Sequence, residues 1–449
     1  MPLTTPESFG CVGDGVTNDY ADFQAACTAL KAAGGGTLDL TPGKTYRIVI
    51  NASTPSLGLV VGGIDIRFNG ATVNFECDST VYCFRPLNHT KFLGPGSVNV
   101  TASTGLGAAN QAIYHAPIAM GFAYGDGGTP ASPSPFAFVS DIVIEGLTFT
   151  SARSAAAGSL VHGFGGMSGV RIRNNVFPDN SNMAIAIGFD WAPLPYGGST
   201  PTQFKTAFNA GTFYSVHPHD LVIEDNQIGN FNLPFANGTG SMGVRLSGVY
   251  SAAVSRNDIQ RATFAAVFIT GGDYSFDFAR TIDRNSQMVN ISVIGNNGRY
   301  CDTYGCYWDA YPDNLYAAET NPSAFGYPYS PIGTVDGYLT NGRIVGNNFR
   351  GVSGGTQYGI VTYFTRGLII SENVISCFGY GVSIKNGSQG VTVSKNTIFS
   401  ANQACVSVGD SAVLPQNTLV DGNYFFNYAA EFYLPSGYSA GTILSNNQP

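Results

Sequence analysis

One asparagine recurs through most of this 449-residue chain in the same short apolar frame, and this repeat constrains the fold most. The residue three positions before each asparagine is Ile or Val, and the residue two positions after it is apolar in every copy except the one with Gly298. Self-similarity at a fixed short period is typical of solenoids, so each copy is interpreted as one coil. The asparagines are Asn175, Asn226, Asn257, Asn296, Asn347, Asn373, Asn396 and Asn423.

The residues around each asparagine indicate strands. Alternating β-branched residues on both sides of one polar residue predict a strand, a tight turn and a second strand. Asparagine tolerates the left-handed backbone that such a turn needs, and its amide can bond the asparagine of the next coil. From Asn347 to Asn423 the copies are 23 to 27 residues apart, which suits a coil of three short strands. Successive coils would stack about 4.8 Å apart. The sequence therefore predicts an all-β fold, a single-stranded parallel β-helix, with asparagines stacked in a ladder.

The N-terminal stretch predicts a cap for this solenoid. Residues 19–33 show a helical pattern with Asn18 as its N-cap, and three glycines end it. Its apolar face would cover the otherwise open first coil. We therefore expect a cap over residues 1–44 and a parallel β-helix over residues 45–449. The apolar face consists of Phe23, Ala26, Cys27 and Leu30.

The same N-terminal stretch carries a family resemblance. The segments FGCVGDGVTND (residues 9–19) and GGGTLDLTPGKTY (residues 34–46) resemble the opening of the pectate-lyase-like superfamily of right-handed β-helices. That superfamily includes polygalacturonase-related hydrolases, pectate lyases, alginate epimerases and bacteriophage tailspike depolymerases. The resemblance implies a right-handed solenoid that acts on a polysaccharide, and a substrate that lies along the strand preceding the asparagine-bearing one. A tailspike would be a homotrimer on a virion tail, whereas a secreted glycosidase would be extracellular.

Composition and charge narrow the partners. The chain carries 29 acidic and 21 basic residues, a net charge of −8, which argues against a nucleic-acid partner. No apolar run has the roughly 18 residues of a membrane helix, and the first five residues lack the features of a signal peptide. Five histidines and no CxxC motif argue against a zinc site, and no acidic cluster indicates Ca²⁺. We expect no metal or other cofactor. The eight cysteines permit either buried thiols or disulfides, with Cys301 and Cys306 close enough to pair.

Four coils are lengthened by insertions, which in repeat proteins usually lie on one functional face. The insertions are expected near residues 101–135, 190–219, 271–288 and 299–332.

Glycoside hydrolysis needs two carboxyl groups, about 5–5.5 Å apart in retaining enzymes and about 6.5–9.5 Å apart in inverting ones. Asp190 and Asp273 end or follow substrate-facing strands two coils apart, and Asp336 lies one coil further. With coils about 4.8 Å apart, the first two suit an inverting pair and the last two a closer one. Asp190, Asp273 and Asp336 are therefore the predicted catalytic carboxylates. Each could instead be a solvated strand-end residue.

Outward-facing cations and aromatics complete the candidate site. Arg245, Tyr363 and Lys385 fall on the outer face of predicted strands, where they could serve β-elimination on a uronate or simply form an exposed ladder. Trp191 and Trp308 both fall in insertions, and Tyr338 lies beside Asp336. We expect Arg245 to act in catalysis, and Trp191, Trp308, Tyr338, Tyr363 and Lys385 to bind substrate.

The sequence thus favours a polysaccharide-cleaving glycoside hydrolase of tailspike or secreted glycosidase type. A polysaccharide lyase and a non-catalytic carbohydrate-binding adhesin are the alternatives.

Overall fold

The computed structural model divides the chain into two compact units. The N-terminal unit comprises Met1–Ile187, Ala192–Gly197 and Pro201–Ser241, and the C-terminal unit comprises Gly188–Trp191, Gly198–Thr200 and Met242–Pro449. The structure describes residues 2–50, 58–77, 83–102, 116–121, 139–151, 159–164, 166–178, 183–188, 218–231, 240–270, 290–309, 338–339, 341–352, 357–409, 414–434 and 441–448.

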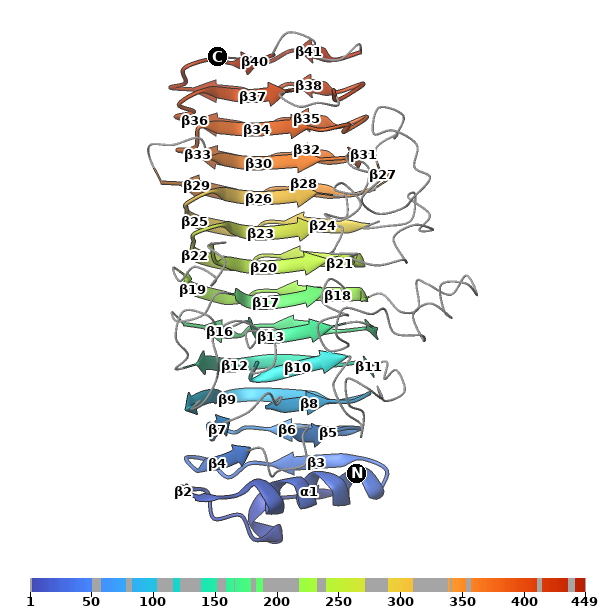
Figure 1. The fold of residues 1–449 in the computed structure, drawn as a ribbon, viewed down its shortest axis with the longest axis vertical. Coiled ribbons are helices and arrows are strands. Elements are labelled where there is room, and N and C mark those ends of the chain that lie inside the picture. The colour runs from blue at the N-terminus through green and yellow to red at the C-terminus, as the bar shows by residue number, and fades with distance from the viewer. Residues whose placement is uncertain are drawn as a thin grey trace, which may run out of the picture. The chain divides into compact units, whose positions relative to one another are not determined.

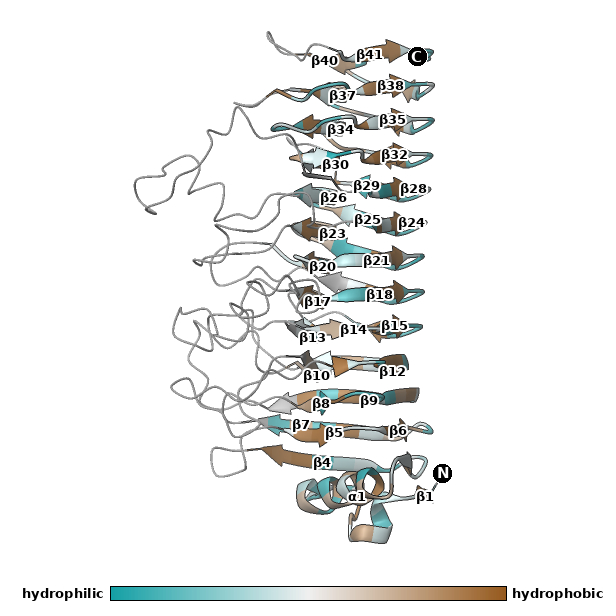
Figure 2. Cartoon of the chain, turned by 90° about the vertical axis from the view of Figure 1, so that its right-hand side faces the viewer, coloured by the Kyte–Doolittle hydropathy of each residue, from teal (hydrophilic) through white to brown (hydrophobic). Residues whose placement is uncertain are grey.

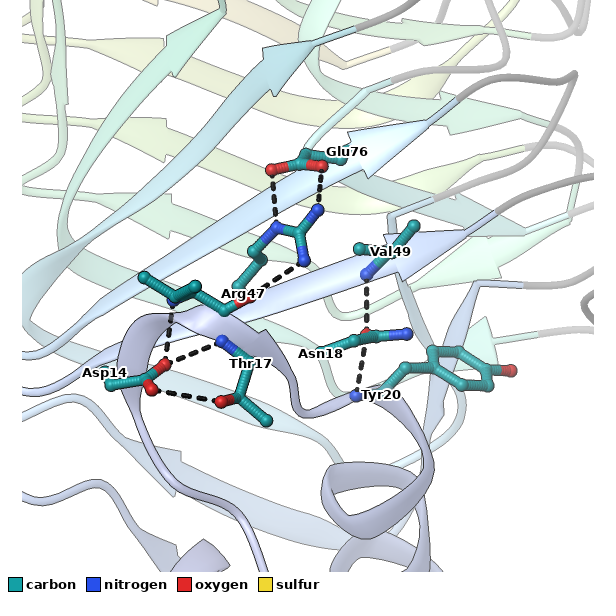
Figure 3. A network of polar contacts seen from close by, with 8 residues as sticks. Asp14, Thr17, Asn18, Tyr20, Arg47, Val49 and Glu76 are labelled. Atoms are coloured by element: carbon teal, nitrogen blue, oxygen red, sulfur yellow. Dashed lines mark hydrogen bonds and ion pairs between the residues drawn. The ribbon is translucent and has the colours of Figure 1, made fainter.

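The predicted cap is present in the N-terminal unit. Helix α1 (Tyr20–Ala32) buries the four predicted residues of its apolar face, and Figure 2 shows that it carries both hydrophilic and hydrophobic residues. Its N-cap is Asp19 rather than Asn18. The Asp19 carboxylate turns back and accepts the backbone N–H of Val12 at 2.7 Å. Asn18 still accepts the N–H of Tyr20, the first helical residue, at 3.2 Å (Figure 3).

Every strand pairing in the N-terminal unit is parallel among the described residues. A first group of strands precedes the one-residue turn of each coil, a second group follows that turn, and a third group forms a separate sheet (Figure 1). A 3₁₀ turn, η1 (Pro6–Phe9), lies near the start of the chain. The strands are β1 (Leu3–Thr4), β2 (Asp14–Asn18), β3 (Gly36–Asp39), β4 (Thr45–Ile50), β5 (Leu59–Val61), β6 (Ile64–Arg67), β7 (Thr72–Cys77), β8 (Phe84–Pro86), β9 (Lys91–Ala102), β10 (Ile118–Gly121), β11 (Val139–Ser140), β12 (Val143–Ser151), β13 (Ser159–Phe164), β14 (Met167–Ser168), β15 (Arg171–Arg173), β16 (Val176–Phe177), β17 (Met183–Gly188), β18 (His219–Glu224) and β19 (Gln227–Phe231).

The C-terminal unit repeats the same coil. Its third sheet, which matters most below, consists of β20 (Met242–Ser247), β23 (Ala265–Thr270), β26 (Tyr304–Asp309), β30 (Tyr358–Tyr363), β34 (Tyr380–Lys385), β37 (Ala404–Val408) and β40 (Phe432–Tyr433). The first group is β21 (Tyr250–Ser255), β24 (Ile291–Ile294), β28 (Arg343–Val345), β32 (Ile369–Ser371), β35 (Thr392–Ser394), β38 (Leu419–Asp421) and β41 (Ile443–Ser445). The second group is β22 (Asp258–Ala262), β25 (Asn297–Cys301), β29 (Asn348–Gly351), β33 (Val374–Ser376), β36 (Thr397–Phe399) and β39 (Tyr424–Phe426). A short pair, β27 (Tyr338–Leu339) with β31 (Thr365–Arg366), lies apart.

Successive parallel strands joined by right-handed crossovers define a right-handed β-helix, and both units have this architecture. The predicted all-β fold with an N-terminal helical cap is therefore confirmed.

The predicted asparagine ladder is present in each unit. In the C-terminal unit the side-chain amide of Asn373 donates to Oδ1 of Asn396 at 2.9 Å and to the carbonyl of Ile344 at 2.9 Å. Asn175 makes the equivalent bonds to Asn226 and Ile144 in the N-terminal unit. The ladder asparagines are buried, so each amide satisfies turn backbone that water does not reach.

The left-handed residue of the turn is the one before the ladder asparagine, not the asparagine itself as the sequence led us to expect. Its φ is 56° at Asn174 and 58° at Glu372, and glycine takes the position in three coils. The ladder asparagine is instead needed for its buried side-chain amide, which makes the hydrogen bonds of the ladder. The left-handed residues are Asn174, Asp225, Arg256, Gly295, Gly346, Glu372, Lys395, Gly422 and Asn446.

Two of the predicted insertions start or end differently from expectation. Strand β10 lies inside the predicted insertion 101–135, and β25 and β26 occupy the start of the predicted insertion 299–332. The parallel pairing of β23, β26 and β30 makes residues 304–309 a regular part of the coil. Most of the remaining insertion residues, including all of 271–288, lie outside the described residues.

Seven cysteines have described side chains, and all are free thiols, including Cys301 and Cys306. Burial raises the pKa of Cys301 to about 12, so this thiol is protonated at neutral pH. In the described part of the chain, no helix has the length and apolar character required to cross a membrane.

Candidate functional site

The third sheet of the C-terminal unit separates its side chains as the sequence predicts. Val244, Leu246, Val267, Ile269, Val382 and Ile384 point inward and are completely buried. Between them, Arg245, Phe268 and Tyr363 point outward and are partly exposed. The outer face of this sheet is therefore where the sequence-predicted site residues with described side chains are found.

One row on this outer face brings polar groups together in consecutive coils. The strand register places Thr270, Asp309, Tyr363 and Lys385 directly beside one another. Tyr363 and Lys385 are predicted from the sequence, whereas Asp309, which lies between Thr270 and Tyr363, is not. The carboxylate belongs to Asp309 and the ammonium group to Lys385. These two residues lie two strands apart in a sheet whose strands are about 4.8 Å apart.

Asp309 is an outward-facing carboxylate that is only 9% exposed. Its Oδ2 accepts a hydrogen bond from the hydroxyl of Tyr307 at 3.3 Å, two residues earlier on the same face of β26. The alternation in YGCYWD would have indicated an outward Asp309 once residues 304–309 were taken as a strand. Assigning that segment to an insertion hid the signal.

A neighbouring row is aromatic. The rings of Phe268 and Tyr307 stack with centroids 4.8 Å apart, and the guanidinium carbon of Arg245 lies 5.7 Å from the centroid of Phe268. Tyr307 also contacts the ring of Tyr363 at 5.4 Å. The row therefore connects the predicted Arg245 to the polar row through ring contacts. Cation–π contacts of this kind fix the position of an arginine without neutralising its charge.

A third row stands at the start of the same strands. Tyr304, Tyr358 and Tyr380 stack in consecutive coils, with centroids 5.8 and 5.1 Å apart. Lys385 lies along Tyr358, with Nζ donating to its hydroxyl at 3.0 Å and 4.5 Å from the ring centroid. Because these rings stack on one another, they present edges and hydroxyl groups outward rather than whole faces. Burial raises the pKa of Tyr304, so its hydroxyl remains a donor at neutral pH.

Trp308 does not occupy the predicted position. It lies inside β26, points into the coil and is 0% exposed, so its ring is not available to a ligand. The assignment of Trp308 to an insertion, and with it the expected sugar-stacking role, is therefore wrong. The alternation that turns Asp309 and Tyr307 outward turns Trp308 inward.

The structure also separates Arg245 from the other predicted cation. Arg245 lies on β20 and Lys385 on β34, four strand steps apart, or about 19 Å. Arg245 and Lys385 therefore cannot act on the same atom of one ligand. Asp190, Trp191, Asp273 and Asp336 lie outside the described residues, as does the side chain of Tyr338.

Among the residues that the structure describes, no three His, Cys, Asp or Glu side chains gather as metal ligands would. The described outer face offers a carboxylate, two cations and a set of hydroxyl groups.

No family model and no curated protein sequence matches the chain. Solved structures do match it. The Dettilon tailspike protein superposes with a TM-score of 0.58 at 13% identity, covering 97% of this chain and 68% of the tailspike. The tailspike of Escherichia coli bacteriophage HK620 in complex with a pentasaccharide gives 0.54 at 12%, covering 94% and 66%. PfbA, a surface adhesin of Streptococcus pneumoniae, gives 0.54 at 12%, covering 96% and 91%. These likenesses show that the chain shares the parallel β-helix fold of these proteins.

Proposed function

We propose that the chain is a polysaccharide-cleaving glycoside hydrolase that binds its substrate along the outer face of the third sheet of the C-terminal unit. The observation that carries the proposal is Asp309, a nearly buried carboxylate bonded to Tyr307 and bordered by Tyr363 and the aromatic rows. A little-exposed carboxyl group held by a neighbouring hydroxyl group is the type of residue that serves as a general acid or base in glycosidases. The tyrosine edges supply hydroxyl groups for sugar hydroxyls. The pentasaccharide bound to a tailspike of the same fold supports this ligand class.

In this mechanism Asp309 is one of two carboxyl groups. It would protonate the glycosidic oxygen or activate the attacking water, and the second carboxyl group would take the other role. Asp190, Asp273 and Asp336 remain the proposed sources of that second group. Arg245, held over Phe268, would bind substrate two coils from Asp309.

β-Elimination is the second candidate, because Tyr363 and Lys385 lie in adjacent coils. Lys385 would neutralise a uronate carboxylate while a neighbouring base removes the proton at C5, and the glycosidic C4–O bond breaks to give the C4=C5 double bond and a new reducing end. A binding protein without catalysis is the third, and the adhesin with this fold supports it.

Product analysis on a panel of bacterial polysaccharides tests all three. New reducing ends without the ultraviolet absorbance of an unsaturated uronate support the hydrolase. New reducing ends with that absorbance assign a lyase. Binding without products assigns an adhesin.

We also propose that the protein works outside the cell or on a virion tail, as a homotrimer. Apolar side chains are exposed on the first and second strand groups of the C-terminal unit, where Phe399 and Phe426 stack 5.2 Å apart. Contiguous exposed apolar side chains usually mark an interface. Sedimentation should show a trimer that F426S dissociates, and a monomeric wild type would contradict this proposal. The exposed set is Ile369, Val374, Phe399, Tyr424, Phe426 and Ile443.

A further inference from the structure

The N-terminal unit contains a pocket that the proposed function does not use. It has a volume of about 510 Å³ and lies over the first strand group, where Gly34 and Gly63 leave space and Gly36 also lines the cavity. Its wall is a row in strand register across β6, β9, β12 and β15, formed by Asp65, Lys91, Val143 and Arg171. Pockets for small ligands usually have about 300–1,000 Å³, so this one is large enough for one or two sugar rings.

Above that row, the turn residues contribute a second polar pair. His89 and Asp141 occupy the left-handed turn positions of adjacent coils, with φ of 59° and 55°. Nδ1 of His89 lies 3.0 Å from Oδ2 of Asp141, and both side chains are more than half exposed. Their carboxylate and imidazole therefore border the pocket and are open to a ligand.

Some charged side chains of this pocket have an oppositely charged partner, and one does not. Lys91 Nζ pairs with Asp65 at 3.3 Å, and in the adjacent row Arg173 pairs with Glu145 at 2.9 Å. Arg171, exposed at the pocket wall, makes no side-chain hydrogen bond or ion pair with the residues that the structure describes. Val143 separates Arg171 from Lys91 and gives the wall an apolar step. The pocket thus presents one unneutralised guanidinium at Arg171, together with the carboxylates of Asp141 and, three strand steps or about 14 Å from Arg171, of Asp65.

We propose that this pocket is a second carbohydrate site, which binds an acidic mono- or disaccharide. The guanidinium of Arg171 takes the anionic group, because its planar fork matches a carboxylate. Asp141 accepts hydrogen bonds from the hydroxyls of the ring that Arg171 holds, and Val143 contacts that ring. Asp65, about 14 Å from Arg171, accepts hydrogen bonds from the second ring of a disaccharide. The proposal stands independently of the function proposed for the C-terminal unit.

The test compares glucuronate, glucose and acetate by calorimetric titration of the full chain. Glucuronate carries both the carboxylate and the hydroxyls, glucose lacks the carboxylate, and acetate lacks the hydroxyls. We expect glucuronate to bind at least about tenfold more tightly than either, the weight of one charge-assisted bond. R171A should reduce glucuronate affinity to the level of glucose. Hydrogen exchange should show glucuronate protecting peptides from β9 and β12.

The chain offers a matched control in Arg343. Arg343 precedes Ile344 as Arg171 precedes Ile172, so it has the same position in the repeat, and its guanidinium bonds Ser292 at 3.0 Å. R343A should leave glucuronate binding unchanged. The proposal is overturned if R171A binds glucuronate as the wild type does, if R343A weakens binding equally, or if glucuronate binds no better than glucose. Protection confined to the C-terminal unit would also overturn it.

Discussion

The outer faces of the third sheets differ sharply between the two units, although their inner faces are alike. In the N-terminal unit this face carries Arg85, Ala119 and His162, all less than 5% exposed. In the C-terminal unit it carries Arg245, Phe268 and Tyr307, all partly exposed. Inner residues such as Val161 and Val267 are completely buried in both. The interior of the coil determines the fold, so the outer residues are free to determine what each unit binds.

The largest expected difference between the two units comes from replacing one titratable side chain in each of them. Asp309→Asn should lower turnover by about 10²–10⁴, the usual weight of a general acid or base. His162→Gln should leave turnover unchanged, because His162 lies in the N-terminal unit and bonds Ser159 at 2.9 Å as a buried structural group. Initial rates on a verified polysaccharide measure both effects.

Melting temperatures of the two variants provide the control, and the amide of Asp309→Asn is nearly isosteric with the carboxyl group that it replaces. A His162→Gln variant that melts normally but loses turnover, beside an active Asp309→Asn variant, would move the chemistry to the N-terminal unit. Asp258→Asn, on the second strand group, is the matched aspartate control for position.

The likeness of the two interiors predicts equal losses from the ladder. Asn373→Leu and Asn175→Leu should each lower the free energy of unfolding by about 1–3 kcal/mol, because buried turn groups lose their partners. Asn348→Leu, at an exposed amide that bonds Asn297, should cost less. Urea unfolding measures all three. If one ladder variant unfolds like the wild type, the two interiors are not equivalent.

A smaller effect is expected from the hydroxyl that positions Asp309. Tyr307→Phe removes one hydrogen bond and keeps the ring stacked on Phe268. A single bond to a charged group contributes about 1.5 kcal/mol, so turnover should fall about tenfold. Tyr424→Phe, exposed on the second strand group, is the matched control and should be silent. Unchanged turnover in Tyr307→Phe would mean that Asp309 does not depend on this contact.

The sequence predicted the interior much better than the outer face. Ladder asparagines and inward residues such as Val244 recur with the period of the coil, and periodicity is visible in a sequence. Asp309 belongs to no repeated pattern. From the sequence alone, the neighbouring Trp308 could equally be an aromatic residue in a loop or a residue of the core. Only the pairing of β26 with β23 and β30 fixes which of the two points outward. The strand register between segments that are distant in the sequence is therefore what could not be predicted from the sequence.

The smallest expected effect concerns surface ion pairs on the second strand group, which occur in both units. Arg47 and Glu76 pair in the N-terminal unit, with both carboxylate oxygens engaged at 2.7 Å (Figure 3), and Arg299 pairs with Asp258 in the C-terminal unit.

Hydrogen bonds from Arg47 lower the pKa of Glu76. The pair therefore stabilises the fold above the ordinary Glu pKa of about 4.3 and loses this contribution as the pH falls below it. Because both side chains are about a third exposed, Glu76→Gln should cost only about 0.5 kcal/mol near pH 7 and less near pH 3. Urea unfolding at both pH values measures the difference, and Asp258→Asn should give an equally small value. A loss above about 2 kcal/mol for Glu76→Gln alone would show that this pair anchors the capped end in a way that its counterpart does not.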